Sequence, residues 1–199
     1  MKEMKIRITF TEDVLGMMPS SPHIYEEYVA SKAPDAWTTA EEVDALGIEA
    51  VVENGRDVFP KLEDGTPYWY DYHFKGFLKD STQALRKVKN TVSSKYKAYK
   101  KTIDGNIFFF PRRCPIHEVG PRYDFQRPLR AATPMGERIS LKSSETIKAG
   151  AWVETTVRCM NEEDLELVKE CLDYGALRGM GEWRNAGWGR FTWEEVPET

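Results

Sequence analysis

Cysteine and long hydrophobic runs are scarce in this chain of 199 residues. Its three cysteines, Cys114, Cys159 and Cys171, show no CxxC spacing, which argues against a disulfide framework or a zinc site and favours buried thiols. No apolar run approaches the roughly 18 residues that would span a bilayer. The start, Met1 to Ile6, lacks the apolar stretch of a signal peptide. We therefore expect a cytoplasmic protein without a membrane, metal or cofactor partner.

The sequence also lacks the glycine motifs that bind nucleotide phosphates. A Walker loop needs Gly-Lys-Ser/Thr opening a helix, and a dinucleotide motif needs GxGxxG between a strand and a helix. The glycine-rich run of this chain, Gly179 to Arg190, instead follows an expected helix and opens an expected strand, Arg190 to Val196. Two Gly-apolar-Gly triplets flank five residues in this run. Because glycine lets a ligand or another strand approach the main chain, the run predicts a shaped loop.

Charge of one sign is scarce in each part of the chain in turn, although the net charge is only -4. Residues 1–74 carry 6 Lys and Arg against 15 Asp and Glu, residues 75–130 carry 14 against 4, and residues 131–199 carry 8 against 13. A basic centre between acidic flanks suits a nucleic-acid binder with a confined contact surface. The alternative is a solvated, lysine-rich helical face. The carboxylates of residues 26–64 follow neither EF-hand nor HExxH spacing.

Apolar periodicity predicts a mixed fold. Alternation over Met4 to Phe10 indicates a half-buried strand, and Asp64-Gly65 is a hairpin turn signal. Helical spacing and capping signals add helices, and β-rich runs add strands. The expected helices cover residues 22–31, 39–53, 75–89 and 162–174, and the expected strands cover 68–74, 107–110, 152–159 and 190–196. This order suits an α+β fold of the ferredoxin-like or RNA-recognition type, an antiparallel sheet packed by helices.

We expect a single domain over residues 1–199 with two additions. Residues 20–56 form an acidic helical insertion, and residues 105–145 form an irregular basic hairpin arm because Pro, Gly and Arg are frequent after Pro111.

The glycine-rich run resembles the C-terminal signature of the RAMP superfamily, the repeat-associated mysterious proteins of CRISPR effector complexes. Residues Gly179 to Gly189 match its layout of two G-apolar-G triplets around five residues that include a basic one. Phe74 to Lys79 looks like the "hKGhhR" helix start of the RNA-coating backbone subunits, and Ala149 to Glu154 with Asn161 to Leu165 is similar to the strand and helix before the loop. The resemblance covers roughly residues 68 to 195. The chain departs from the family in its acidic balance and in Lys79, where an arginine is usual.

The resemblance implies an RNA-recognition-type core with a glycine loop beside bound RNA and a helix that helps to hold the guide backbone. The chain also has the layout of uncharacterised phage proteins, which would make it a phage-encoded or divergent relative. The partners implied are single-stranded RNA and the protein subunits of an antiviral defence ribonucleoprotein, or further copies of the chain.

Basic side chains and the glycine loop are the expected RNA contacts, by phosphate binding and by base stacking. Lysines 95, 97, 100 and 101, interleaved with Tyr96 and Tyr99, extend this set. The alternative for the loop is a simple helix-to-strand connection whose tryptophans close the core. The expected RNA-binding residues are Lys75, Lys79, Arg86, Lys87, Lys89, Gly179, Gly181, Trp183, Arg184, Gly187, Gly189 and Arg190.

Catalysis is not the main expectation, because the chain has only 3 histidines and nothing in the sequence fixes a partner for them. The candidates for a metal-independent ribonuclease are His23, Tyr25 and His117. A further hypothesis is a phage-type accessory or anti-defence protein that binds a host protein or a small nucleotide, since the acidic segment would suit a basic partner.

Overall fold

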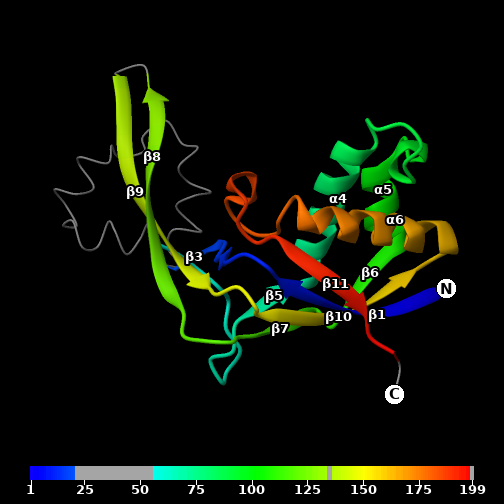
Figure 1. The fold of residues 1–199 in the computed structure, drawn as a ribbon, viewed down its shortest axis with the longest axis horizontal. Helices are drawn as coiled ribbons and strands as arrows, with labels where there is room; N and C mark the ends of the chain where they lie inside the picture. Colours follow the sequence, from blue (N-terminus) through cyan, green and yellow to red (C-terminus); the bar gives the residue numbers. More distant parts are fainter. Residues whose placement is uncertain (21–55, 134–135, 198–199) are drawn as a thin grey trace. The chain divides into compact units, whose positions relative to one another are not determined.

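The computed structural model describes residues 1–20, 56–133 and 136–197 and divides the chain into two compact units (Figure 1). Unit 1 lies within Met1–Val14, Pro60–Pro121 and Ile147–Thr199, and unit 2 lies within Leu15–Phe59 and Arg122–Thr146. The helices expected over 22–31 and 39–53 fall outside the described residues. Among those described, no helix combines the length and the apolar character needed to cross a membrane.

Unit 1 is an antiparallel sheet with helices packed on one side (Figure 1). Its strands follow the order β11-β1-β10-β7-β5 across the sheet, and β6 pairs with β10 next to β7. Since β6 and β7 together act as one strand, the chain runs strand, helix, strand, strand, helix, strand, with the outer strands in ferredoxin-like order. The expected fold class is therefore confirmed. The elements are β1 (Lys2–Phe10), β5 (Tyr68–Tyr70), α4 (Asp71–Leu85), η1 (Ser93–Lys95), α5 (Tyr99–Asn106), β6 (Ile107–Phe110), β7 (Arg113–His117), β10 (Trp152–Cys159), α6 (Glu162–Asp173), η2 (Tyr174–Ala176), η3 (Arg184–Ala186) and β11 (Phe191–Glu195).

Alternating residues of the central strands build the core of unit 1. Ile6 and Ile8 of β1 are fully buried and lie opposite Thr155 and Val153 of β10, which are also buried. Successive side chains of a strand point to opposite faces of the sheet. The buried side chains of the strands therefore pack on the helices, and the side chains that alternate with them lie on the second face. We call this second face the open face.

The three cysteines are buried and free, as predicted. Burial raises the pKa of the Cys171 thiol to about 12 and that of Cys114 to about 11. The Sγ of Cys171 lies 3.3 Å from Oγ1 of Thr82, so it joins α6 to α4.

Helix α6 begins where the sequence predicts it. The Asn161 side chain accepts a hydrogen bond of 2.7 Å from the main-chain N–H of Asp164, which caps the helix. The expected aromatic strand over 68–74 is wrong in its second half, because α4 already begins at Asp71. Its Oδ1 accepts the N–H of Tyr72 in the first helical turn. Phe74, Phe77 and Leu78 are then buried at helical spacing.

Two other boundaries differ from the expected ones. Helix α4 ends at Leu85, and Asn90 has a left-handed φ of 67°, so Lys87 and Lys89 lie beyond the helix. Asp104 and Gly105 belong to α5 and do not form a turn.

Unit 2 is a sheet around a long hairpin. Its strands are β2 (Val14–Leu15), β3 (Met18–Pro19), β4 (Arg56–Val58), β8 (Tyr123–Thr133) and β9 (Gly136–Ile147). The order is β2-β9-β4-β3, and β8 pairs with β9. The arm expected to be irregular is thus a regular ladder from Tyr123 opposite Thr146 to Thr133 opposite Gly136. Pro128 is tolerated because β8 is an edge strand, where one row of N–H groups needs no partner.

A buried carboxylate organises the sheet of unit 2. Glu145 accepts the main-chain N–H of Phe59 at 3.0 Å and pairs with Arg122 at 3.1 Å. Lys142 pairs in turn with Asp57 at 2.5 Å. These contacts join β4 to β9 beside their parallel pairing.

Candidate nucleic-acid interface

The glycine loop is closed on itself by close contact between its two arms. The N–H of Met180 donates to the carbonyl of Gly189 at 2.9 Å. A Cβ at Gly179 would lie 2.0 Å from the Trp188 oxygen, and one at Gly189 would lie 1.9 Å from the Met180 oxygen. Another main-chain segment therefore lies too close to Gly179 and Gly189 for any side chain, and Gly189 also has a left-handed φ of 66°.

The middle glycines of the loop provide its turns. Gly181 and Gly187 have φ values of 90° and 92°, in the left-handed region that favours glycine. Trp183, which is not a glycine, also lies there with a φ of 54°. Its ring is nearly parallel to that of Trp188, with 6.4 Å between the ring centroids and 18° between the ring planes. Trp183 is 39% exposed.

The two arginines of the loop differ in their ion pairing with the described residues. Arg184 lies 3.2 Å from the Asp80 carboxylate of α4, which also pairs with Arg178 at 2.7 Å. Arg190 is exposed and forms no ion pair with a described residue. It lines a cavity of about 250 Å³. The cavity is lined by Glu12, Asp13, Ala186, Gly187, Trp188 and Arg190.

The basic stripe of α4 faces α5. Lys75 donates to the main-chain oxygen of Asp104 at 3.1 Å, and Lys79 pairs with the carboxylate of the same residue at 2.6 Å. The guanidinium of Arg86 lies 5.2 Å from the centre of the Tyr99 ring. These three predicted RNA contacts therefore also fasten α5 to α4.

The lysines that follow α4, up to Lys101, have no carboxylate partner among the described residues. These lysines are exposed, and so is Arg86 at the end of the helix, which likewise forms no ion pair with a described residue. This set, which we call the basic cluster, consists of Arg86, Lys87, Lys89, Lys95, Lys97, Lys100 and Lys101. The carboxylate of Glu170 fixes the chain between its members, because it accepts the N–H groups of Val92 at 2.6 Å and Ser93 at 2.8 Å.

The glycine loop and the stripe that faces α5 lie on different flanks of α4. Asp80, the loop contact, lies one residue after Lys79, so about 100° of helical rotation separates them. The structure thus brings Arg184 to α4 but does not join it to the predicted lysines in one surface.

The described histidines have packing roles. Burial lowers the pKa of His73 to about 4, and its ring lies 6.1 Å from that of Trp69. His117 is exposed and stacks on Trp152, with 3.8 Å between centroids and 11° between planes. The candidates His23 and Tyr25 lie outside the described residues.

The open face of the sheet carries exposed aromatic rings that the sequence analysis did not select. Phe108 and Phe110 of β6 are 37% and 43% exposed. The guanidinium of Arg158 lies 4.9 Å from the Phe110 ring, and Nζ of Lys75 lies 4.6 Å from the Phe108 ring. Four consecutive apolar residues in a short strand place two of them on each face, and this pattern could have revealed the exposed pair.

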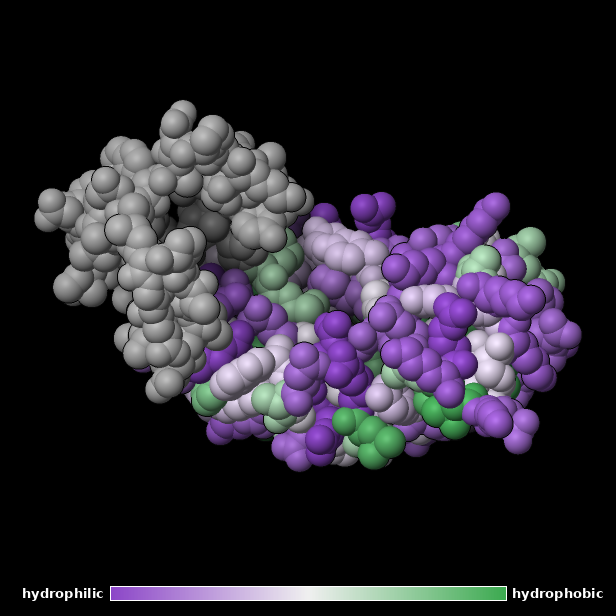
Figure 2. Space-filling model, turned by 90° about the horizontal axis from the view of Figure 1, so that it is seen from above, coloured by the Kyte–Doolittle hydropathy of each residue, from purple (hydrophilic) through white to green (hydrophobic). Residues whose placement is uncertain are grey.

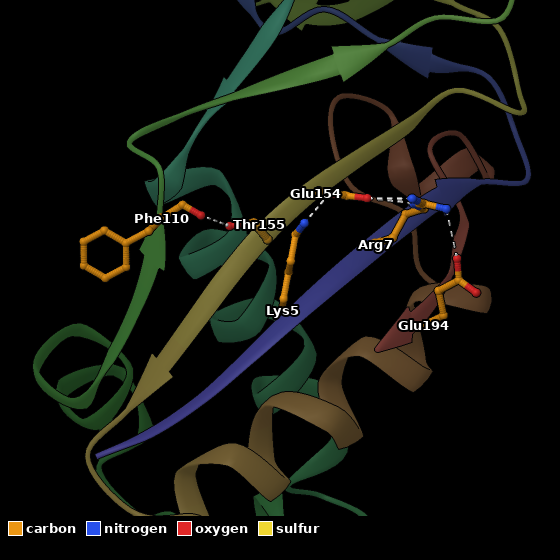
Figure 3. A network of polar contacts seen from close by, with 6 residues as sticks. All are labelled: Lys5, Arg7, Phe110, Glu154, Thr155 and Glu194. Atoms are coloured by element: carbon orange, nitrogen blue, oxygen red, sulfur yellow. Dashed lines mark hydrogen bonds and ion pairs between the residues drawn. The ribbon is translucent and has the colours of Figure 1, made fainter. Parts of the chain in front are cut away.

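A network of ion pairs orders the middle of the open face (Figure 3). Arg7 donates to Glu154 through Nε at 3.0 Å and through Nη2 at 2.7 Å, and Lys5 pairs with Glu154 at 2.8 Å. Hydrogen bonds from these two cations hold the pKa of Glu154 below its usual range. Arg7 also reaches Glu194 at 3.5 Å. Its guanidinium lies 4.7 Å from the centre of the Trp152 ring.

Elsewhere the visible surface is mostly polar. Figure 2 shows hydrophilic residues over most of the described part of one side, with hydrophobic residues in small groups.

No protein-family model matches this chain, and no curated protein matches it. Among solved structures, the chain is similar to a chain of the "Cryo-EM structure of the Type III-B Cmr-beta bound to cognate target RNA", with a TM-score of 0.54 and 11% sequence identity. The two chains share a fold. The match covers 98% of the present chain and 60% of the Cmr-beta chain, so the present chain corresponds to little more than half of that protein.

Proposed function

We propose that this protein binds single-stranded RNA by its phosphate backbone, as a RAMP-like subunit of a CRISPR-type or related defence ribonucleoprotein. The observation that carries the proposal is the basic cluster, seven exposed cations within residues 86–101 that no described carboxylate neutralises. Phosphate binding requires local positive charge, which a net charge of -4 does not prevent.

The fold supports the proposal independently of the cluster. The chain shares it with a protein chain of Cmr-beta, a complex bound to its target RNA. Arg190 and Trp183 of the glycine loop add a second contact in this proposal. The arginine has no ion-pair partner among the described residues, and the tryptophan side chain is 39% exposed. In this proposal the exposed part of the tryptophan contacts a base.

Catalysis is not part of the proposal. His117 uses one ring face on Trp152, and the low pKa of His73 leaves it neutral near pH 7. Neither histidine forms a hydrogen bond with a described acid or base that would mark it for proton transfer.

Polarisation titrations with fluorescent single-stranded RNA test the proposal. Each phosphate contact contributes a slope of about 0.7 in log K against log salt, so Lys87→Ala/Lys89→Ala should weaken binding roughly 25-fold near 0.1 M salt. The matched control is Lys2→Ala/Lys169→Ala, which removes the same charge from lysines paired with Glu162 and Glu166. The control should bind like the wild type. Equal losses in both variants, or no salt-sensitive binding by the wild type, would contradict the proposal.

A further inference from the structure

Two phenylalanines of β6 lie on the open face and not in the core. In β6, Ile107 and Phe109 are buried, whereas Phe108 and Phe110 keep 37% and 43% of their surface exposed. Phenylalanine is common in strands, but two exposed rings on one short strand lie together, and contiguous apolar patches on a surface mark binding sites. In Figure 3 the Phe110 ring points away from β10, although its carbonyl accepts the Thr155 hydroxyl at 3.0 Å.

Each of these rings is accompanied by a cation. Arg158 lies 4.9 Å from the centre of the Phe110 ring and is fixed by Glu3 at 2.8 Å. Lys75 lies 4.6 Å from the centre of the Phe108 ring. A flat ring beside a fixed cation offers a stacking surface and a phosphate contact together.

A second stack lies further along the same face. The Trp152 ring has His117 at 3.8 Å and the Arg7 guanidinium at 4.7 Å. Since β1 and β7 flank β10 on opposite sides, these two groups approach the ring from its two sides. The imidazole ends the stack, and His117 remains exposed.

Strand register places the rings in one row. His117 is level with Trp152, Phe110 with Thr156, and Phe108 with Arg158. At about 3.4 Å per residue, Phe108 and Phe110 are about 7 Å apart, and His117 lies about 14 Å further along the row. A row of this length matches a few extended nucleotides.

The charge of the face favours nucleic acid as its occupant. The carboxylates of Glu3, Glu154 and Glu194 are each paired with arginine or lysine, so they position cations and are neutralised by them. Arg113 adds a cation near the Tyr68 ring, at 5.5 Å. Bases carry flat π-faces and their backbone carries phosphates, which is the chemistry complementary to this surface.

We infer that the open face binds the unstacked bases of single-stranded RNA, with Phe108, Phe110 and His117 as stacking platforms and Arg158 and Lys75 as phosphate contacts. This inference rests on the proposed RNA-binding function and extends it. The basic cluster holds the RNA backbone, and the open face holds bases.

The test uses a short single-stranded RNA containing 2-aminopurine, whose fluorescence falls when the base stacks on an aromatic ring. Wild-type protein should quench it. Phe108→Leu/Phe110→Leu keeps both side chains apolar but removes both rings, and it should lose the quenching and bind roughly tenfold or more weakly. Replacing the bases by abasic sites should weaken binding to the wild-type protein by the same factor as the double substitution does. It should not weaken binding to the variant any further, because the two changes remove the same interaction.

A photocrosslink provides a measurement that does not depend on a variant. RNA containing 5-iodouridine should crosslink to peptides that contain Phe108, Phe110 or His117 when bound to the wild-type protein. Crosslinks confined to other peptides would overturn the inference.

Other results would also overturn it. Unchanged affinity and quenching in the double variant would show that the rings do not contact bases. Loss of quenching in Trp183→Leu alone would assign base stacking to the glycine loop. A self-association of the wild type that the double variant lacks, with RNA binding unchanged, would make the face a protein interface. If the wild type shows no salt-sensitive RNA binding, the proposed function itself fails, whereas salt-sensitive binding indifferent to the rings overturns this inference alone.

Discussion

His73 is a titratable residue whose environment makes the stability of the fold depend on pH. It lies in α4 among aromatic rings, its Nδ1 is buried without a hydrogen bond, and burial lowers its pKa to about 4. The unfolded chain binds a proton at its ordinary pKa of about 6.5, so protonation favours the unfolded state. The stabilisation is therefore complete above pH 6.5 and is lost progressively as the pH falls toward 4.

We predict that the free energy of unfolding falls by about 2 kcal/mol between pH 7 and pH 5 through His73 alone. Urea unfolding at the two pH values measures it, and in His73→Phe this part of the fall should disappear. The control is His117→Phe, which replaces another histidine and leaves His73 in place, so the part of the fall that comes from His73 should remain. An equal fall in wild type and His73→Phe would show that other groups cause it.

At the scale of elements, α6 fixes the segment that carries the basic cluster. The Glu170 carboxylate accepts the N–H groups of Val92 and Ser93, and the Ser93 hydroxyl at 2.5 Å. Ser93 is fully buried, so removal of the acceptor leaves its donors unsatisfied.

Glu170→Ala should therefore lower the free energy of unfolding by about 2–3 kcal/mol in urea titrations. The control on the same helix is Glu166→Ala. Glu166 is exposed and pairs with the half-buried Lys169, so its loss should cost less than about 1 kcal/mol. Hydrogen exchange should show faster amides at Val92 and Ser93 in Glu170→Ala. Similar stability of the two variants would contradict this role for Glu170.

The order of elements could be predicted because local patterns determine it. Alternation in β1, the Asn161 cap of α6 and the glycine-framed loop before β11 are visible in the sequence, and these elements are sufficient for a ferredoxin-like order. The start of α4 at Asp71 was missed, because aromatic residues favour strands locally and only burial of Phe74 and Phe77 against the sheet makes the segment helical.

The candidate site was less predictable, because it depends on contacts between distant segments. Lys75 and Lys79 look like free cations in the sequence, but α5 folds back so that Asp104 meets both. Arg184 likewise meets Asp80, more than a hundred positions earlier in the chain. The residues left unpaired, such as Lys87 and Arg190, could be identified only after these pairs were assigned.

At the scale of the whole molecule, the net charge does not indicate where positive charge is available to bind phosphates. The chain is acidic by four charges, yet the cations of the basic cluster lack carboxylate partners among the described residues, whereas Arg7 and Arg158 are ion-paired. Long-range attraction of RNA is therefore weak, and binding depends on close contacts with phosphates.

This distribution leads to a quantitative prediction about salt. If four to seven cations of the basic cluster contact phosphates, log K should fall against log salt with a slope between about -3 and -5. The affinity should then drop roughly 60- to 1000-fold between about 50 mM and about 200 mM salt. Lys87→Ala/Lys89→Ala should flatten the slope by about 1.4, because each neutralised phosphate contributes about 0.7. Phe108→Leu/Phe110→Leu should lower affinity at every salt concentration and leave the slope unchanged, since stacking releases no counterions. Parallel lines for the phenylalanine variant and converging lines for the lysine variant would separate base contacts from backbone contacts. A wild-type slope shallower than about -1 would contradict phosphate binding by the basic cluster.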